Sequence, residues 1–313
     1  MNDFGRQSEP FLFILDFELK KPILLPIKDV NPEEICFDIH GFTNLNVVGP
    51  PLSQADFQKF PITPDQYRHA FEEVLNHIRL GNTYLLNLTF KTKIQTSLSL
   101  PEIFELSNAP YKLLYKDQFV VFSPEAFVKI DDNTISSYPM KGTIDAGIQN
   151  AETVLLNDSK ELTEHNTIVD LIRNDLSMVS KNVRVEKFRY IDKIKTHEKE
   201  LLQTSSKICG DLPPDWKAHI GDILITMLPA GSISGAPKKK TVDIITEVEN
   251  FNRGYFTGIF GYFDGKKLDS AVMIRFIEKI GDELYFKSGG GITSFSNCES
   301  EYREMVDKVY LPV

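Results

Sequence analysis

The sequence predicts an α+β fold in which one helix followed by several antiparallel strands occurs twice along the chain. A capped amphipathic pattern over residues 63–82 is followed by apolar runs typical of strands. A second helical pattern over residues 236–250 precedes further strands joined by Asp-Gly and Gly-Asp turns, which favour hairpins. The 313 residues, 42% of them apolar, can bury one large core or two coupled cores.

Residues 1–62 are expected to form a short lead segment packed on the core, and residues 63–313 the main domain. The lead segment holds one strand-like run, FLFILDFEL, and then a connector rich in proline and glycine, GPPLSQ. It is too short to bury an independent core of its own.

The first helix has clear signals at both ends. Thr63 is the expected N-cap, Pro64 occupies the first turn, Gln66 completes a capping box, and Gly81 follows the last turn. One face of this helix is apolar, and it consists of Tyr67, Phe71, Val74, Leu75 and Ile78.

Strands are expected after each helix. Residues 83–94 form one strand, and residues 119–130 form two short strands that meet at a Ser-Pro pair. The second helix has Val242, Ile245 and Val248 at helical spacing. Residues 255–288 then give three strands joined by the two turns.

Charge and composition exclude several classes of protein. The formal net charge of −9 argues against a general nucleic-acid binder, but it allows a small anionic substrate held by a few local cations. The N-terminus lacks a basic signal region, and the early run FLFIL is far shorter than the roughly 20 residues of a membrane span, so a cytoplasmic protein without a membrane segment is expected. Cys36, Cys209 and Cys298 are widely spaced and are expected to be reduced thiols.

Two glutamates continue the apolar stripe of a helix predicted over residues 159–176. Glu161 and Glu164 fall on the inward arc, where carboxylates are costly unless a positive group meets them. Mg²⁺ would do this, although a solvated pair is the commoner arrangement of two glutamates. His165 is either part of the same site or a hydrogen-bonded core histidine. The apolar members of the arc are Ile168, Leu171 and Ile172.

A second acidic pair with the same spacing, Glu301 and Glu304, lies in a helical pattern over residues 296–310. The apolar arc leaves Glu301 at its edge and Glu304 beyond it, which favours solvated side chains. A loop is expected before this helix, at SGGGITSFS. Its three glycines either allow the backbone to approach an anion closely or make the loop flexible.

Several motifs together resemble those of the chorismate-utilising enzymes over residues 64–313. The matching stretches are PMKGT, ELTEHNTIVDLIRND, LPAGSISGAPK, YFTGIFGYFDG and GGGITSFSNCESEYREMVDKV. The resemblance implies a four-layer α/β/β/α catalytic domain with two orthogonally packed antiparallel sheets. It agrees with the helix-then-strands pattern that the residues predict by themselves.

Lys141 in PMKGT distinguishes the branches of this family. The branch that makes anthranilate usually has a small residue here, as in PIAGT, whereas the aminodeoxychorismate synthase branch has PIKGT. A lysine in this place would attack C2 of chorismate, and ammonia would then attack C4 while the lysine departs. Lys141 must be neutral to attack, so burial and nearby positive charge should lower its pKa. Outside this context a solvated lysine in a turn would be the better interpretation.

The resemblance also implies roles for other residues, each of which would more often be solvated in an unrelated sequence. Glu125 matches a general acid that protonates the departing C4 hydroxyl. The expected Mg²⁺ ligands are Glu164 and Glu304, supported by Glu161 and Glu301. The expected substrate-binding residues are Arg275 and Tyr262 at the enolpyruvyl carboxylate, Gly142, Thr143, the backbone of Gly289, Gly290 and Gly291, and Lys238 near the ring carboxylate.

Two positions depart from the motifs of relatives with other reactions. Leu85 stands where isochorismate synthases have a lysine that activates water, so addition of water is not expected. Gln203 stands where anthranilate enzymes have a histidine associated with pyruvate elimination, and an amide is a poor proton shuttle. Retention of the enolpyruvyl group is therefore expected.

The resemblance implies a glutamine amidotransferase subunit as the source of ammonia, since none of the cysteines lies in a glycine-flanked nucleophile elbow. The leading interpretation is an enzyme that aminates chorismate at C4 in the synthesis of a folate precursor. Two alternatives remain. One is an enzyme of the same fold that makes anthranilate, and Lys141 distinguishes the two. The other is an inert relative with a binding or regulatory role, against which the complete residue set argues.

Overall fold

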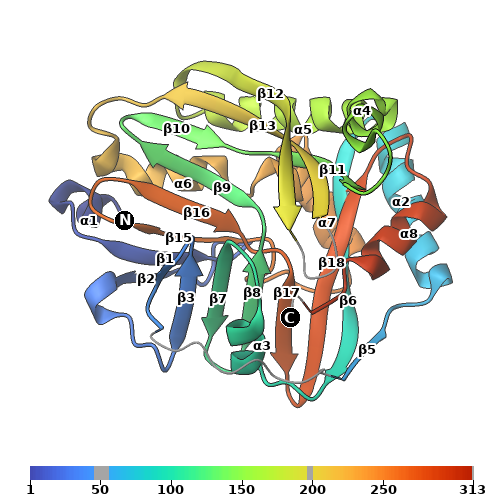
Figure 1. Ribbon diagram of the computed structural model, residues 1–313, viewed down its shortest axis with the longest axis horizontal. Coiled ribbons are helices and arrows are strands. Elements are labelled where there is room, and N and C mark those ends of the chain that lie inside the picture. Colours follow the sequence, from blue (N-terminus) through green and yellow to red (C-terminus); the bar gives the residue numbers. More distant parts are fainter. Residues whose placement is uncertain (46–55, 196–199, 312–313) are drawn as a thin grey trace. The chain divides into compact units, whose positions relative to one another are not determined.

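Residues 1–45, 56–195 and 200–311 are described by the structure, a computed structural model (Figure 1). The connector GPPLSQ lies outside the described residues. The strands form two antiparallel sheets accompanied by helices, so the expected α+β class is confirmed. Contacts divide the chain into two compact units. The first unit contains residues 1–9, 125–232 and 263–270, and the second contains residues 10–124, 233–262 and 271–313. The division at residue 62 stays a prediction.

The first unit consists of antiparallel strands and the helices that pack on them (Figure 1). Its strands are β9 (Ala126–Asp131), β10 (Thr134–Ser137), β11 (Met140–Asp145), β12 (Lys181–Lys195) and β13 (Glu200–Asp211). Their order is β11-β13-β10-β9, with β12 also on β13. The helices are α1 (Asn2–Gln7), α4 (Ala151–Asn157), α5 (Ser159–Ser177) and α6 (Ile220–Met227), with short 3₁₀ turns at η2 (Trp216–His219) and η3 (Gly231–Ile233).

Helix α5 lies against β11, β12 and β13, and α4 lies against β11 and β13. Asp158 caps α5 by accepting a hydrogen bond from the Glu161 amide across 3.0 Å, which orients the first turn of the helix. The ladder between β11 and β13 shifts register between Lys141 and Thr143. Gly142, at the shift, has φ of 78°, a value that glycine adopts without steric cost. The acidic first turns of α5 therefore lie beside β11.

The second unit contains the second sheet and four helices (Figure 1). The sheet has the order β14-β6-β18-β17-β8-β7-β3-β4, with β5 on β6. These strands are β3 (Ile35–Ile39), β4 (Phe42–Thr43), β5 (Phe57–Phe60), β6 (Leu85–Thr96), β7 (Tyr111–Tyr115), β8 (Phe119–Ser123), β14 (Gly235–Ala236), β17 (Phe276–Ile280) and β18 (Glu283–Ile292). The helices are α2 (Pro64–Arg79), α3 (Leu100–Leu106), α7 (Lys238–Val248) and α8 (Cys298–Asp307).

The remaining elements belong to the first sheet or to a connection. They are β1 (Phe11–Leu15), β2 (Ile23–Pro26), β15 (Ile259–Phe263), β16 (Leu268–Val272) and the 3₁₀ turn η1 (Ile27–Asp29). Strand β1 confirms the strand expected in FLFILDFEL, and all five of its residues are buried. Among the helices of the described part of the chain, none combines the length and apolar content needed to cross a membrane.

The sequence signals of helix α2 are confirmed. Its capping box forms between Thr63 and Gln66, and Pro64 occupies the first turn. The inward face packs on β6 and on the two neighbouring helices, through Tyr67, Phe71, Val74, Leu86, Leu88, Ile244, Ile245 and Met305. The helix therefore forms for local reasons and is held by tertiary packing.

The expectation of three strands after α7 is wrong, because the structure has four: β15, β16, β17 and β18. The second and third are separated at Arg275, whose φ of 52° lies outside the extended region. The strand-like run AVMIRFIEKI does not indicate that Arg275 has a positive φ. The strands predicted on either side of the Ser-Pro pair are confirmed as β8 and β9, and they belong to different sheets.

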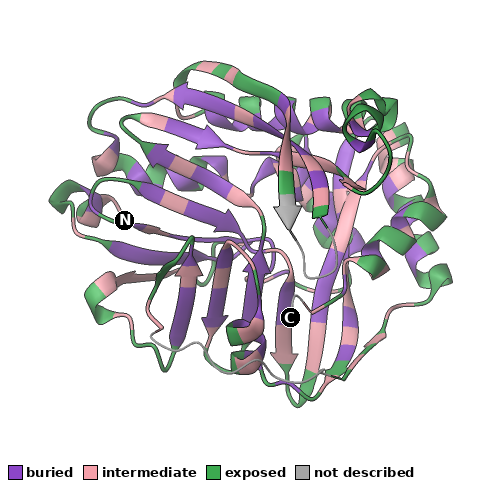
Figure 2. Ribbon diagram, in the orientation of Figure 1, coloured by how far each residue is buried: buried purple, intermediate pink, exposed green. Residues whose placement is uncertain are grey.

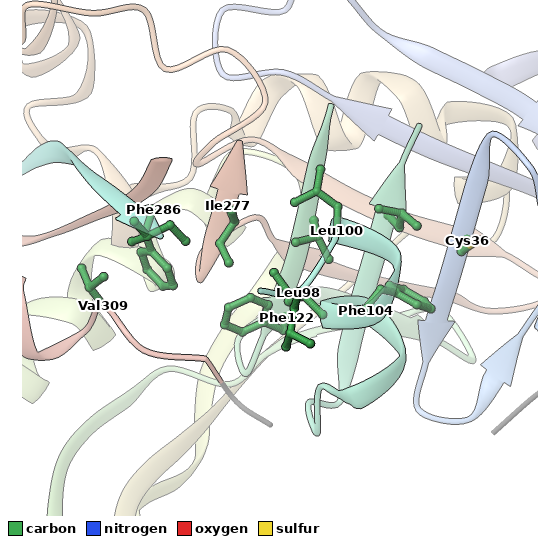
Figure 3. Packing of buried hydrophobic residues seen from close by; sticks show 12 residues of the cluster. Cys36, Leu98, Leu100, Phe104, Phe122, Ile277, Phe286 and Val309 are labelled. Carbon is green, nitrogen blue, oxygen red and sulfur yellow. The ribbon is translucent and has the colours of Figure 1, made fainter. Parts of the chain in front are cut away.

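A hydrophobic cluster beneath α3 anchors the second unit (Figure 3). The cluster includes Leu100 and Phe104 of the helix, Phe122 of β8, Ile277 of β17 and Phe286 of β18. Strands β1 and β8 are buried throughout, whereas helices such as α2 and α5 carry both buried and exposed residues (Figure 2). This distribution is the ordinary one for helices that cover a sheet on one side.

Candidate functional site

Lys141 and Glu164 are joined in the first unit. The lysine lies in β11 and its Nζ donates to Glu164 Oε2 across 2.7 Å. Both side chains are half-buried, with 31% and 29% of their surface exposed. The exposed Lys160, one turn before the glutamate on α5, approaches Oε1 at 3.6 Å. The inward carboxylate is therefore met by positive charge from the chain itself.

The turn after Lys141 brings backbone and carboxylate close together. A Cβ at Gly142 would lie 3.0 Å from Glu161 Oε2 and 3.1 Å from Leu155 Cδ1, so a side chain there would be crowded as well as strained by φ. The Thr204 hydroxyl donates to the Lys141 carbonyl. Thr143 is exposed and its Oγ1 lies 3.4 Å from Gln203 Nε2. From Met140 onward PMKGT therefore lies in strand β11, and not in a solvated turn.

Glu161 is half-buried beside Glu164, as the helical arc predicts. Burial raises the pKa of its carboxyl, and the charge of Glu164 raises it further, while the charge of Lys141 lowers it. A carboxyl in this condition gains from any additional cation beside it.

His165 is a core residue, which decides between the two readings left open by the sequence. Its side chain is fully buried and its Nε2 lies 2.6 Å from Ser206 Oγ of β13. Burial lowers the pKa of the imidazole to about 4, and the charges of Arg189 and Lys141 act in the same direction. The neutral His165 therefore has a structural role, because it joins α5 to β13.

Glu125 follows the Ser-Pro pair and is held by a residue that the sequence did not single out. The Ser232 hydroxyl, in η3, donates to Glu125 Oε1 across 2.8 Å. The preceding amide, that of Gly231, donates to Oδ2 of the buried Asp175 across 2.9 Å. Ser232 and Asp175 both lie within motifs quoted above, and their spacing along the chain gave no sign that they meet.

The glycine run belongs to a strand, so the expectation of a loop at Gly289–291 is wrong. These residues pair with β6 in the ladder of β18. A Cβ on Gly289 would collide with the backbone oxygen of Leu88, so the glycine is required by a close approach that only the tertiary structure reveals. Leu85 is buried, and its Cδ1 would lie 3.1 Å from a Cβ on Gly291.

Glu301 is buried, with 6% of its surface exposed, so the expectation that it is solvated is wrong. Helix α8 packs on β18, where Gly290 has no side chain, and a Cβ there would lie 3.4 Å from Glu301 Oε2. Glu304 is exposed, as expected, and its Oε1 lies 2.7 Å from Lys308 Nζ. Lys308 also donates to the Gly289 carbonyl across 2.8 Å, and it too was missed.

The expected substrate-binding residues of the second unit have various environments. The Arg275 guanidinium lies 5.5 Å over the ring of Tyr310, and its Nε donates to the Tyr310 hydroxyl across 3.3 Å. Tyr262 stacks on Phe42 with the ring centroids 4.4 Å apart. Lys238 is half-buried at the first position of α7. Their contact with a substrate stays a prediction.

The predicted residues form two sets. The first unit joins Lys141, Glu161 and Glu164, and the second joins Glu301, Glu304 and the glycines of β18. That the two sets share one site stays a prediction. Each set offers a pair of carboxylates, and these are the hard oxygen donors that Mg²⁺ prefers. The donor chemistry therefore fits the expected ion.

No cluster of three or more histidine, cysteine, aspartate or glutamate side chains suited to a metal occurs in the part of the chain that the structure describes. Mg²⁺ does not require such a cluster, because it is commonly held by one or two carboxylates together with water and substrate oxygens. Cys36, Cys209 and Cys298 are free thiols, as expected.

One family model and two relatives match this chain in sequence. A family model described as chorismate binding enzyme matches residues 39–312. An uncharacterized PabA-like protein of Haemophilus influenzae is 54% identical over 312 residues, which cover 100% of this chain and 95% of the relative. Aminodeoxychorismate synthase component 1 of Bacillus subtilis is 31% identical over 265 residues, covering 80% of this chain and 55% of the relative.

A solved structure shows the same fold. Anthranilate synthase component I from Streptococcus pneumoniae superposes with a TM-score of 0.66 and 26% identity, covering 82% of this chain and 59% of the other. This chain spans 55% of the Bacillus subtilis relative and 59% of the Streptococcus pneumoniae chain.

Proposed function

Since the chain belongs to the chorismate binding enzyme family, we propose that it aminates chorismate at C4, giving 4-amino-4-deoxychorismate for the synthesis of 4-aminobenzoate and folate. The proposal is supported by the relative in Bacillus subtilis that is named aminodeoxychorismate synthase component 1. The observation that carries the proposal is the primary amine of Lys141, held by the Glu164 carboxylate in a half-buried strand.

The proposed reaction uses Lys141 as a transient nucleophile. Its Nζ lies 2.7 Å from Glu164 Oε2, which orients the amine, and the ammonium group must lose a proton before it attacks. The neutral amine attacks C2, the ring double bond shifts, and the C4–O bond breaks as Glu125 protonates the departing oxygen, which leaves as water. Ammonia then forms the C4–N bond, and the C2–N bond to Lys141 breaks. The net change replaces the hydroxyl with an amino group.

Mg²⁺ is proposed to be held by Glu164 and Glu304, with Glu161 and Glu301 in support. When bound, it neutralises the ring carboxylate of a dianionic substrate, which a protein of net charge −9 otherwise repels. Burial and the charge of Glu164 raise the pKa of Glu161, so a cation beside this carboxyl would favour its charged form.

The binding of the rest of the substrate is assigned by charge and shape. Arg275, with Tyr262, is proposed to bind the enolpyruvyl carboxylate, because a guanidinium matches a planar carboxylate with two parallel hydrogen bonds. Gly142, Thr143, the backbone of Gly289–291 and Lys238 complete the binding site. A glutamine amidotransferase subunit is proposed to supply ammonia. Gln203, whose amide cannot shuttle protons, fits retention of the enolpyruvyl group.

One incubation tests this function. Purified protein receives chorismate, Mg²⁺ and an ammonium salt, and the products are separated before and after addition of 4-amino-4-deoxychorismate lyase. The expected product retains the enolpyruvyl ether and releases pyruvate only with the lyase. Anthranilate with stoichiometric pyruvate, formed without lyase, would instead assign the chain to the ortho-aminating enzymes. Absence of any chorismate consumption would favour a binding or regulatory role.

A further inference from the structure

We propose that Ser232 is a positioning residue that orients Glu125 and tunes its affinity for a proton, and that Asp175 holds Ser232 in place. This inference rests on the proposed function, in which Glu125 is the acid. The three residues all lie in the first unit. Ser232 bonds to Glu125, and the amide of its neighbour Gly231 bonds to Asp175, so these bonds join segments far apart in the sequence.

Glu125 needs such a partner because of its place in the chain. It lies between the last residue of β8, Ser123, and the first residue of β9, Ala126, outside both strands. Strand pairing therefore does not fix the orientation of the Glu125 side chain. The Ser232 hydroxyl approaches Glu125 Oε1 at 2.8 Å, and both residues are half-buried, so the bond is partly shielded from water.

The turn that carries Ser232 is itself held by a hydrogen bond to Asp175. Ser232 lies in the 3₁₀ turn η3, and the Gly231 amide donates to Asp175 Oδ2 across 2.9 Å. A Cβ on Gly231 would lie 3.0 Å from that same oxygen, so glycine permits the approach. Asp175 is buried near the end of α5, the helix that also carries Glu164. One helix therefore positions both the partner of Lys141 and, through η3, the partner of Glu125.

A serine hydroxyl is suited to this task because it can donate and accept. It accepts from the carboxylic acid form of Glu125 and donates to the carboxylate that remains after the proton passes to the departing C4 oxygen. Donation to the carboxylate stabilises the charged form, so Glu125 gives up its proton more readily. In this step the C4–O bond breaks and one O–H bond forms, and the Ser232 proton stays on serine.

Three variants test the inference. Ser232→Ala removes the hydroxyl, Ser232→Thr retains it, and Ser177→Ala is the matched control, since Ser177 bonds only locally to the Arg173 carbonyl on the exposed end of α5. Ser232→Ala should lower kcat about 10-fold with KM nearly unchanged, and it should move the basic limb of the pH–rate profile up by about one pH unit. Ser232→Thr and Ser177→Ala should resemble the parent.

A second measurement does not depend on activity. In protein labelled with ¹³C at the glutamate carboxyls, the Glu125 resonance is identified from the spectrum of Glu125→Gln, and its titration midpoint is followed by NMR. The midpoint should rise by about one pH unit in Ser232→Ala and return in Ser232→Thr. An unchanged midpoint in Ser232→Ala overturns the inference, whatever the activity. A parent protein without amination refutes the proposed function and the catalytic role of Ser232 together, even if the midpoint moves.

Asp175 gives an independent test of the anchor. Asp175→Asn retains an oxygen that can accept from the Gly231 amide, whereas Asp175→Ala does not. The asparagine variant should keep the Glu125 titration midpoint of the parent, and the alanine variant should reproduce the shift of Ser232→Ala while its circular dichroism spectrum stays that of the folded protein. If folded Asp175→Ala keeps the Glu125 titration midpoint of the parent, Ser232 does not depend on Asp175. This result would overturn the proposal that Asp175 holds Ser232 in place.

Discussion

Lys141 in β11 and Glu164 in α5 form a hydrogen-bonded ion pair across 2.7 Å, although 23 positions separate them in the chain. The glutamate has a second cation nearby, Lys160, at 3.6 Å and largely exposed. Two lysines therefore face one carboxylate, and only one of them comes from the strand that the proposed reaction uses. Lys141 and Lys160 can therefore be mutated separately, with Lys160 as the control for Lys141.

Lys141→Ala should lose at least about 100-fold in the rate of C4 amination at moderate ammonia, because the covalent route through C2 is closed. Some product aminated at C2 is expected to replace it. Lys160→Ala should keep nearly the rate of the parent, since an exposed ion pair contributes little. The measurement is the lyase-coupled formation of 4-aminobenzoate. Equal rates in Lys141→Ala and the parent would exclude the covalent mechanism for this protein.

Glu304→Gln should lose Mg²⁺ affinity, and activity should fall by on the order of 100-fold, because a bound metal typically supplies several kcal/mol. The melting temperature should change little, since Glu304 is exposed on α8. Titration calorimetry with MgCl₂ measures the affinity without turnover. Glu299→Gln, on the same helix and also exposed, is the control. Full activity of the parent in excess chelator would contradict the metal assignment.

The stability of the protein should depend on His165 below neutral pH. Burial lowers the pKa of this histidine in the folded state from 6.5 to about 4. Between these values the unfolded chain binds a proton that the folded chain does not, so the free energy of unfolding should fall as pH falls from 6.5 to 4. The loss attributable to His165 should reach about 3 kcal/mol at most.

Urea unfolding at a series of pH values measures this effect. His165→Gln should remove the corresponding part of the pH dependence, and an amide can keep a hydrogen bond to Ser206. His69→Gln, at an exposed position of α2, should retain the dependence of the parent. If both variants show the same slope between pH 4 and 6.5, His165 is not the titrating group.

The buried pair Glu249 and Arg253 should be important for stability. Their side chains are each 1% exposed and their charged atoms are 2.7 Å apart, and Glu249 also accepts from the Thr89 amide at 2.9 Å. Glu249→Gln leaves the guanidinium without its counter-charge, which should destabilise the protein by about 3–5 kcal/mol. Asp170→Asn, which breaks the exposed pair with Arg173, should cost less than about 0.5 kcal/mol in the same urea experiment.

The parts that the sequence predicted correctly depend on neighbours within a few residues. The capping box of α2, the inward arc of α5 and the strands around the Ser-Pro pair follow from spacing, turn residues and hydrophobic period, and all are observed. The resemblance of PMKGT to the motifs of the chorismate-utilising enzymes likewise indicates Lys141 as a candidate. These features are determined locally, so the sequence alone determined them.

The tertiary structure decided what local rules cannot see. A Cβ on Gly289 would collide with the Leu88 backbone of a strand far earlier in the chain, and Glu301 is buried on α8, which packs against β18. The bond from Ser232 to Glu125 spans 107 positions. The hydrophobic period predicts only on which face of its own helix or strand a side chain lies. Its burial and its hydrogen bonds depend on which distant segment packs against that face. For this reason the sequence identified the chemical groups, and the fold determined their partners.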